Sequence, residues 1–253
     1  YLVNDHWSPD ARYTFLNLAD ETAAVDWPIP LERAILSDKD KAHPRMAEVT
    51  PFPAPAPVGR RALVTGANGQ LGRELMRALP EAGFTVTGVD LPEVSISDAE
   101  QVAALPWDDI DVVINAAAWT NVDGAETPEG RRATWQANST GPAVLAREAT
   151  AHGVTMVHIS TEYVFDGTQD VHLEDEAPSP LGAYGQSKAG GDAAVASTPK
   201  HYIVRTSWVV GDGKNFLKTM ASLADQGISP SVVSDQVGRL TFTSDLARGI
   251  IHL

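Results

Sequence analysis

The stretch RALVTGANGQLG at residues 61–72 decides the fold of this chain. Residues 61–65 form a short apolar run, which is typical of a strand buried on both faces. A turn with glycines at every third position follows, and apolar residues then recur at helical spacing through Leu79. The sequence therefore predicts a strand, a glycine turn and a helix in direct succession.

The turn itself contains Gly66, Gly69 and Gly72. Glycines let the backbone turn tightly and approach a pyrophosphate, and the first turn of the following helix offers free N–H groups and a positive dipole end. With a strand before it and an acidic strand end after it, the turn predicts a dinucleotide site. The alternative is an ordinary turn between a strand and a helix.

Strands and helices alternate along the rest of the chain. We expect further strands at residues 84–89, 112–114, 154–159 and 202–204, and helices at 99–105, 133–152, 184–195 and 216–223. This alternation predicts an α/β fold, a Rossmann-like doubly wound parallel sheet with helices on both faces.

The first 50 residues differ from the rest in composition and pattern, with many charges and no long periodic run. The stretch PFPAPAP at 51–57 has four prolines in seven residues and favours an extended spacer. We therefore predict three parts: an N-terminal segment at 1–50, a proline-rich linker at 51–59 and a dinucleotide-binding domain at 60–253. The alternative for the prolines is a surface loop.

Composition narrows the function classes. The 253 residues include no cysteine, which excludes disulfides and thiolate chemistry. Asp and Glu number 33 against 19 Lys and Arg, and the formal net charge of −14 argues against binding nucleic acid or an anionic membrane. No apolar run approaches the ~18 residues of a membrane span. We expect a soluble cytoplasmic protein.

Two features follow strand ends on the expected cofactor side. Asp90 ends the second strand, where its carboxylate would accept hydrogen bonds from ribose hydroxyls and repel a 2′-phosphate, which favours NAD without excluding NADP. The alternative is a turn-forming Asp before Pro92. Ala116, Ala117 and Ala118 follow the third strand, where small side chains let a flat cofactor approach, although packing against a helix explains them equally well.

A tyrosine and a lysine, Tyr184 and Lys188, lie four residues apart in an expected helix and so share one face. A phenol with a pKa of ~10 is a poor acid at neutral pH, and we expect the lysine to lower it. Ser160 and Thr161 end the fourth strand, where a hydroxyl would polarise a substrate oxygen. On their own, these residues are also compatible with a solvated helix and a strand-terminal cap.

At this point the sequence resembles a known family. The glycine turn, Asn138, Ser160–Thr161 and the Tyr184–Lys188 pair are similar to those of extended short-chain dehydrogenases/reductases. More narrowly, five phrases resemble the dTDP-4-dehydrorhamnose reductases: GQLG at 69–72, NAAA at 115–118, NSTGP at 138–142, HISTEYVFDG at 158–167 and RTSW at 205–208, with DQVGR at 235–239 in addition. The resemblance covers residues 60–253, and it implies a smaller C-terminal substrate lobe after the sheet, incomplete in this sequence.

The resemblance implies a role for each matching position. The catalytic set would be Thr161, Tyr184 and Lys188. NADP(H) or NAD(H) would be bound by Gly66, Asn68, Gly69, Gln70, Leu71, Gly72, Asp90, Ser95, Ile96, Ala116, Ala117, Ala118, Asn138, Tyr184 and Lys188. A dTDP-sugar would meet Thr161, Glu162, Tyr163, Trp208 and Arg239. The sequence departs from the family at Glu162, where Asp is usual, at Trp119, where Tyr is common, and at Ser95, where Asp is frequent.

The reaction implied is NAD(P)H-dependent reduction of the 4-keto group of dTDP-4-dehydro-L-rhamnose. Two alternatives remain: a nucleotide-sugar 4-epimerase or dehydratase, which shares the Thr–Tyr–Lys set, and a non-catalytic dinucleotide-binding regulatory subunit. Some family members use magnesium, and Glu74 would be a candidate ligand, but one carboxylate does not make a metal site. A homodimer is also left open.

The N-terminal segment carries a shorter resemblance. Residues 1–44, with DWP at 26–28 and LSDKD at 36–40, resemble the tail of a dTDP-4-dehydrorhamnose 3,5-epimerase. This implies a fused or associated epimerase as a partner. Because the epimerase's catalytic residues would lie upstream, we do not expect this chain to epimerise, and we expect it to be a fragment of a longer protein.

Overall fold

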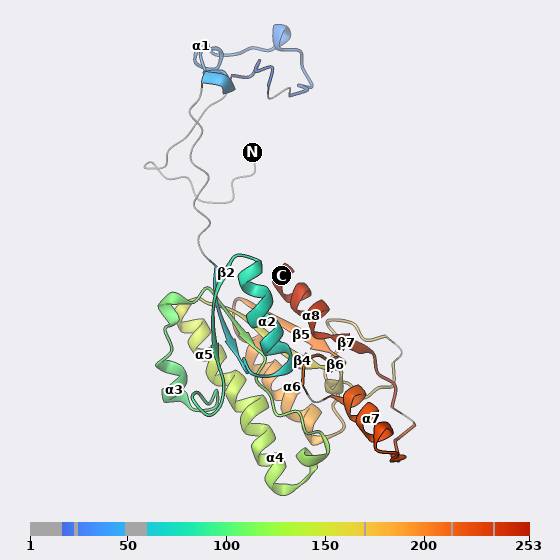
Figure 1. Cartoon of the computed structure of the whole chain (residues 1–253). Coiled ribbons are helices and arrows are strands. Elements are labelled where there is room, and N and C mark those ends of the chain that lie inside the picture. Colours follow the sequence, from blue (N-terminus) through green and yellow to red (C-terminus); the bar gives the residue numbers. More distant parts are fainter. Residues whose placement is uncertain (1–16, 23–24, 49–59, 170, 214, 235) are drawn as a thin grey trace. The chain divides into compact units, whose positions relative to one another are not determined.

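The structure is a computed structural model that describes residues 17–22, 25–48, 60–169, 171–213, 215–234 and 236–253. The chain divides into two compact units, Tyr1–Val58 and Gly59–Leu253 (Figure 1). Each is described by itself. The linker predicted at 51–59 lies outside the described residues.

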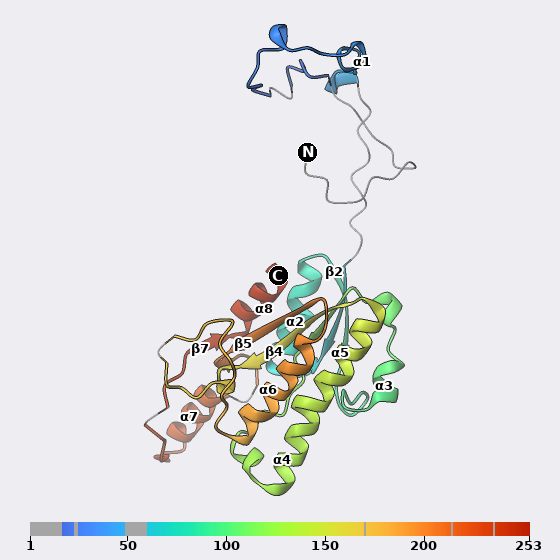
Figure 2. The same ribbon diagram turned by 180° about the vertical axis from the view of Figure 1, so that it is seen from behind.

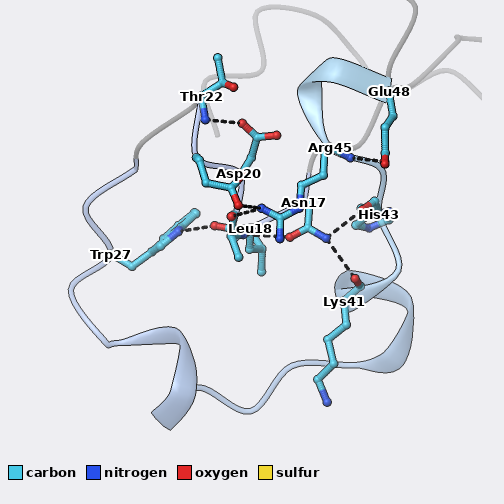
Figure 3. Close-up of polar contacts among 11 residues, drawn as sticks. Asn17, Leu18, Asp20, Thr22, Trp27, Lys41, His43, Arg45 and Glu48 are labelled. Carbon is cyan, nitrogen blue, oxygen red and sulfur yellow. Dashed lines mark hydrogen bonds and ion pairs between the residues drawn. The ribbon is translucent and has the colours of Figure 1, made fainter.

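In the described part of the N-terminal unit, polar contacts join residues 17–18 to Trp27 and to residues 41–43 (Figure 3). The side-chain amide of Asn17 donates to the carbonyl oxygens of Lys41 and His43, at 3.1 and 2.9 Å. The indole N–H of Trp27 donates to the carbonyl of Leu18 at 2.8 Å. The described part contains three single-turn helices, which are η1 (Leu31–Arg33), α1 (Asp38–Lys41) and η2 (Met46–Glu48).

A five-stranded parallel sheet forms the centre of the second unit, in the order β2-β1-β3-β4-β5. Because β2 pairs on one side of β1 and β3 on the other, the course of the chain reverses between β1 and β3. The Rossmann-like doubly wound sheet predicted from the sequence is confirmed. The strands are β1 (Arg60–Thr65), β2 (Phe84–Val89), β3 (Val112–Asn115), β4 (Thr155–Thr161) and β5 (His201–Thr206).

Helices cover both faces of this sheet (Figures 1 and 2). Successive strand residues point to opposite faces, so Leu63 of β1 joins the core under α3, α5 and α6, whereas Ala62 and Val64 join the core under α2 and α8. The helices are α2 (Gln70–Glu81) and α8 (Thr243–His252) on one face, and α3 (Ala99–Ala103), α5 (Gly141–His152) and α6 (Ala183–Ala196) on the other. Short 3₁₀ turns connect these layers: η3 (Trp107–Asp109), η4 (Asp123–Glu126) and η6 (Glu162–Val164).

The helical stretch predicted at 133–152 is confirmed, but it begins earlier, at Pro128, and includes a π-helical segment that was not predicted. The structure has α4 (Pro128–Trp135), a π-helical segment η5 (Gln136–Thr140) and then α5. Pro142 has no N–H, so it cannot bond the carbonyl of Asn138 one turn before it. Gly191 of α6 packs against that carbonyl so closely that a Cβ there would lie 2.2 Å from the oxygen. The break therefore lets α6 approach the helix.

The C-terminal part builds a second, small sheet. It consists of β6 (Trp208–Val210) and β7 (Leu240–Phe242), which pair in parallel, next to α7 (Phe216–Asp225). Only α7 was predicted here, because three-residue strands give too short a pattern to recognise. Among the residues that the structure describes, no helix is long and apolar enough to span a bilayer.

Candidate active site

A cavity of about 980 Å³ opens where the strands of the large sheet end, beside the reversal between β1 and β3. Ligands of open α/β sheets bind at such a switch point. Most of the site residues predicted from the sequence line this cavity: Gly66, Gly69, Gln70, Leu71, Asp90, Ser95, Ile96, Ala116, Ala117, Ala118, Thr161, Glu162, Tyr163, Tyr184, Lys188 and Trp208. Asn68, Gly72, Asn138 and Arg239 are not part of its lining.

The glycine turn is packed too closely for side chains. Gly66 has a φ of +68°, and a Cβ there would lie 2.6 Å from the backbone nitrogen of Ala117. A Cβ at Gly72 would lie 2.0 Å from the carbonyl oxygen of Gly66. Gly72 therefore does not face the cavity but lets α2 begin directly behind the turn.

The start of α2 fits a pyrophosphate. Gly69 is its N-cap, and no side-chain hydrogen bond caps this end among the described residues. The first N–H groups of an α-helix have no partner within the helix, and here Gly69, Gln70 and Leu71 line the cavity. The donors and the dipole end thus remain available to an anion.

The carboxylate of Asp90 is fixed at the end of β2 by two backbone amides. Asn68 N–H donates to Oδ2 and Leu91 N–H to Oδ1, both at 2.8 Å. Asn68 does not line the cavity, but its backbone N–H holds the carboxylate of Asp90 in place. The cavity wall continues past Ser95 and Ile96, as expected for the adenine end of a dinucleotide site.

Tyr184 and Lys188 project from α6 into the same cavity, opposite Thr161 at the end of β4. Burial raises the pKa of Tyr184 to about 12, and a side-chain hydrogen bond with Thr161 opposes this rise. The expectation that Lys188 lowers the pKa of Tyr184 is not met in the cofactor-free protein. Desolvation of the phenol dominates, and Glu162 and Tyr163 add to it.

The amine of Lys188 is turned toward the sheet. Its side chain is 2% exposed, and Nζ donates to the carbonyl of Ile159 at 2.5 Å and lies 3.4 Å from Nε2 of His158. Burial lowers the pKa of Lys188 to about 8, and the carboxylate of Asp192 limits this fall. An amine with this pKa can exchange its proton near neutral pH.

The wall on the expected substrate side is built by η6 and β6. Ser207 donates its hydroxyl to Glu162 Oε1 at 2.6 Å, and burial raises the pKa of Glu162. The ring of Tyr163 meets that of Tyr184 edge-on, with centroids 5.9 Å apart. Trp208 lines the cavity, but Arg239 is exposed outside the lining and contributes backbone bonds, its N–H to Ser207 and its carbonyl to Trp208.

Asn138 is fully buried in the π-helical segment and holds neighbouring backbone in place. Its Oδ1 accepts from Trp119 N–H at 2.8 Å, and its Nδ2 donates to the Trp119 carbonyl and to Ser187 Oγ, each at 3.1 Å. The predicted direct contact with the cofactor is thus not supported by its position. The side chain instead ties the segment after β3 to α6.

Several lining residues were not predicted from the sequence, among them Gln136, Ser207, Asn215 and Phe216. They come from a π-helical segment and from the small lobe, where the sequence predicted a helix at 216–223 but not that its first residues reach the cavity. Two buried groups behind Lys188, His158 and Asp192, were also missed. Asp192 had a signal, because it lies one helical turn after Lys188.

No group of three or more His, Cys, Asp or Glu side chains in the described part of the chain could hold a metal ion. Glu74, the magnesium candidate, pairs with Arg77 at 2.6 Å.

The chain is similar to several known proteins over its second unit. The family model for the RmlD substrate binding domain matches residues 60–253. The spore coat polysaccharide biosynthesis protein SpsK of Bacillus subtilis (strain 168) is 41% identical over 198 residues, which are 76% of this chain and 69% of that protein. A dTDP-4-dehydrorhamnose reductase of Aggregatibacter actinomycetemcomitans is 39% identical over 202 residues, with 76% and 67% covered.

A solved structure shares the fold at similar coverage. It is the dTDP-4-dehydrorhamnose reductase of Bacillus anthracis str. Ames in complex with NADP, with a TM-score of 0.72 and 35% identity over 77% of this chain and 71% of that one. The chain thus spans about two thirds of the length of the curated relatives described above.

Proposed function

This chain belongs to the RmlD substrate binding domain family, and we propose that its cavity reduces the 4-keto group of dTDP-4-dehydro-L-rhamnose to give dTDP-L-rhamnose. The observation that carries the proposal is that a glycine turn free of side chains and the Thr161–Tyr184–Lys188 set line the same cavity. The first suits a dinucleotide, and the second suits proton transfer to a carbonyl oxygen.

The bound cofactor, NADPH or NADH, supplies the hydride. The amide end of α2 and the close-packed glycines fit its pyrophosphate, and Asp90 stands where ribose hydroxyls would lie. The fixed carboxylate of Asp90 favours NADH, whereas the similar Bacillus anthracis protein was solved with NADP. Either cofactor is compatible with this cavity, and an assay with each one measures which the protein prefers.

Tyr184 is the proposed acid. Its high pKa keeps the phenol protonated at neutral pH, so a proton is available for the alkoxide that forms at C4. Thr161, which lines the cavity with the phenol, would share in binding the substrate oxygen. Lys188, with a pKa near 8, would restore the proton and favour the phenolate once the proton has left.

The sugar nucleotide would lie against η6 and β6. Glu162 and Tyr163 follow Thr161 directly, and Trp208 offers a flat apolar surface for a deoxysugar or base. The side chain of Arg239 is exposed beside this wall, so a contact with substrate would require it to fold inward. We therefore rank Arg239 below the other three as a substrate contact.

The proposal is tested by following the absorbance of NADPH and of NADH with the 4-keto sugar nucleotide. The wild type should consume reduced cofactor, and Tyr184→Phe should lose about 10²–10⁴-fold in kcat, the usual contribution of a general acid. Tyr202→Phe, at an exposed tyrosine on β5, is the matched control and should keep full activity. Full turnover by Tyr184→Phe would remove tyrosine from the mechanism.

The two alternatives predict other results. A 4-epimerase or dehydratase of this fold would convert substrate without net consumption of reduced cofactor, and a regulatory subunit would bind the dinucleotide without turnover. A fused or associated epimerase and a cytoplasmic location also remain predictions that accompany this proposal, and a homodimer and the use of magnesium stay open.

A further inference from the structure

A buried group of ionisable side chains lies directly behind Lys188, on the side away from the cavity opening. His158 on β4 is 0% exposed, and Asp192 on α6 is 3% exposed. Neither residue lines the cavity. Burying ionisable side chains is costly unless they are paired, so their presence here needs a physical reason.

The distances connect these groups into one cluster. His158 Nε2 lies 3.4 Å from Lys188 Nζ and 3.7 Å from Asp192 Oδ1. Asp192 Oδ2 lies 3.4 Å from Nε of Arg205, and its Oδ1 has no hydrogen-bond partner in the described part of the chain. The imidazole edge thus stands between the amine and a carboxylate oxygen.

His158 is neutral in this cluster. Burial and the neighbouring Lys188 hold the pKa of His158 well below its usual range. On the other side of the ring, the side-chain amide of Asn115 lies 3.0 Å from Nδ1. An amide can present either its nitrogen or its oxygen, so Asn115 can complement a tautomer in which Nε2 accepts a hydrogen bond from the ammonium.

We propose that His158 and Asp192 are positioning residues for Lys188: His158 Nε2 and the Asp192 carboxylate hold the protonated amine against the carbonyl of Ile159 and set how readily it releases its proton. This inference rests on the proposed function, in which Lys188 resupplies Tyr184. The pair never touches substrate or cofactor. It acts by stabilising the ammonium inside an environment that otherwise favours the neutral amine.

Other titratable groups lie on the elements packed against α6, and none of them stabilises the Lys188 ammonium in this way. Arg205 on β5 is bound to Asp192 and carries the same charge as Lys188. Glu126 of η4 accepts from the N–H of Ala183, the first residue of α6 and the one before Tyr184, at 2.7 Å. The remaining titratable groups near Lys188 are Glu162 and Tyr163 of η6 and Tyr184 itself, and all three line the cavity.

The test is an NMR titration of the lysine side chains in the cofactor-free protein, with the Lys188 resonance assigned by its loss in Lys188→Arg. Asp192→Asn should lower the pKa of Lys188 by at least about one unit, because an opposite charge at this range is removed. His158→Leu should shift it in the same direction by removing the neutral acceptor. Asp192→Glu and His158→Gln, which keep the charge and an acceptor, should stay within about half a unit of the wild type.

Asp111→Asn is the matched control. Asp111 lies just before β3, at the amino-terminal ends of the strands, and pairs there with Arg61 at 3.0 Å. The same chemical change at that position should leave the Lys188 titration unmoved. In assays, the alkaline limb of kcat should follow the NMR shift in Asp192→Asn and His158→Leu, while the KM for the sugar nucleotide stays the same.

The inference is overturned if Lys188 titrates as in the wild type in both Asp192→Asn and His158→Leu. Should those two variants not fold, a shift of more than about one unit in Asp192→Glu and His158→Gln would overturn it equally. Failure of the proposed function looks different: Tyr184→Phe or Lys188→Arg would then retain full turnover, whatever the titration shows.

Discussion

Gly72→Ala is the sharpest single perturbation of the glycine turn. A Cβ at this position would lie 2.0 Å from the carbonyl oxygen of Gly66 and 2.8 Å from two backbone atoms of Ala67. Ordinary contacts between non-bonded heavy atoms are near 3.5–4.0 Å. The backbone of the turn must therefore move by more than about 1 Å, because these neighbours are backbone atoms that cannot rotate away.

The magnitude follows from two opposing effects. Overpacking of this kind costs about 3 kcal/mol, the upper end of its usual range. Alanine in place of glycine within a helix gains up to about 1 kcal/mol. The free energy of unfolding of Gly72→Ala should therefore fall by about 2 kcal/mol. A displaced turn also loses amide bonds to the pyrophosphate, so we expect the affinity for NADPH to fall at least about tenfold, equivalent to about 1.4 kcal/mol.

Gly249→Ala provides the matched control. Gly249 lies in α8, the helix packed against α2, and a Cβ there would meet nothing within 4 Å. This variant should gain up to about 1 kcal/mol and keep wild-type affinity for NADPH. Urea unfolding measures the first quantity, and NADPH fluorescence titration measures the second. Equal stability and equal NADPH affinity in the two variants would refute the argument that close packing at Gly72 shapes the cofactor site.

Three further predictions concern stability. Lys188→Met should abolish a pH dependence of stability. The pKa of Lys188 is about 8 in the folded state and 10.5 ordinarily, so between these values the unfolded state binds more protons and wild-type stability should rise with pH. Thermal melts should show this rise in the wild type and not in the variant. Leu75→Ala, at a fully buried position between α2 and the sheet, should lower the free energy of unfolding by about 2–5 kcal/mol in urea titrations, and a loss below about 1 kcal/mol would contradict the packing described here. Asp111→Asn breaks a partly exposed ion pair with Arg61 and should lower the free energy of unfolding by less than about 1 kcal/mol in the same titration. A loss as large as that of Leu75→Ala would contradict the expectation that this ion pair contributes little.

The sequence predicted the large sheet well because its strands are short apolar runs separated by helical periods. Residues 61–65 and 84–89 illustrate this, and the structure has strands there. The π-helical segment Gln136–Thr140 was missed because a single π turn inside a longer helix leaves no distinct pattern in the sequence. The three-residue strands β6 and β7 were missed because their pairing is set by contacts distant in sequence.

The candidate site was predictable where it follows strand ends or helical spacing, as for Thr161 and for Tyr184 with Lys188. The electrostatics were not, because they depend on burial that the sequence does not reveal. Lys188 was expected to lower the pKa of Tyr184, yet desolvation raises it to about 12. His158 and Asp192 were missed for the same reason, since only the packing of α6 on β4 brings them to Lys188.

The most direct measurement of the central claim is the fate of a labelled hydride. Reduced nicotinamide cofactor carrying deuterium at both hydrogen positions of C4 of its ring would be incubated with the wild-type protein and the 4-keto sugar nucleotide, and the sugar product examined by mass spectrometry and NMR. This account predicts one deuterium at C4 of the sugar for each cofactor oxidised. Product formed without deuterium and without cofactor oxidation would contradict it.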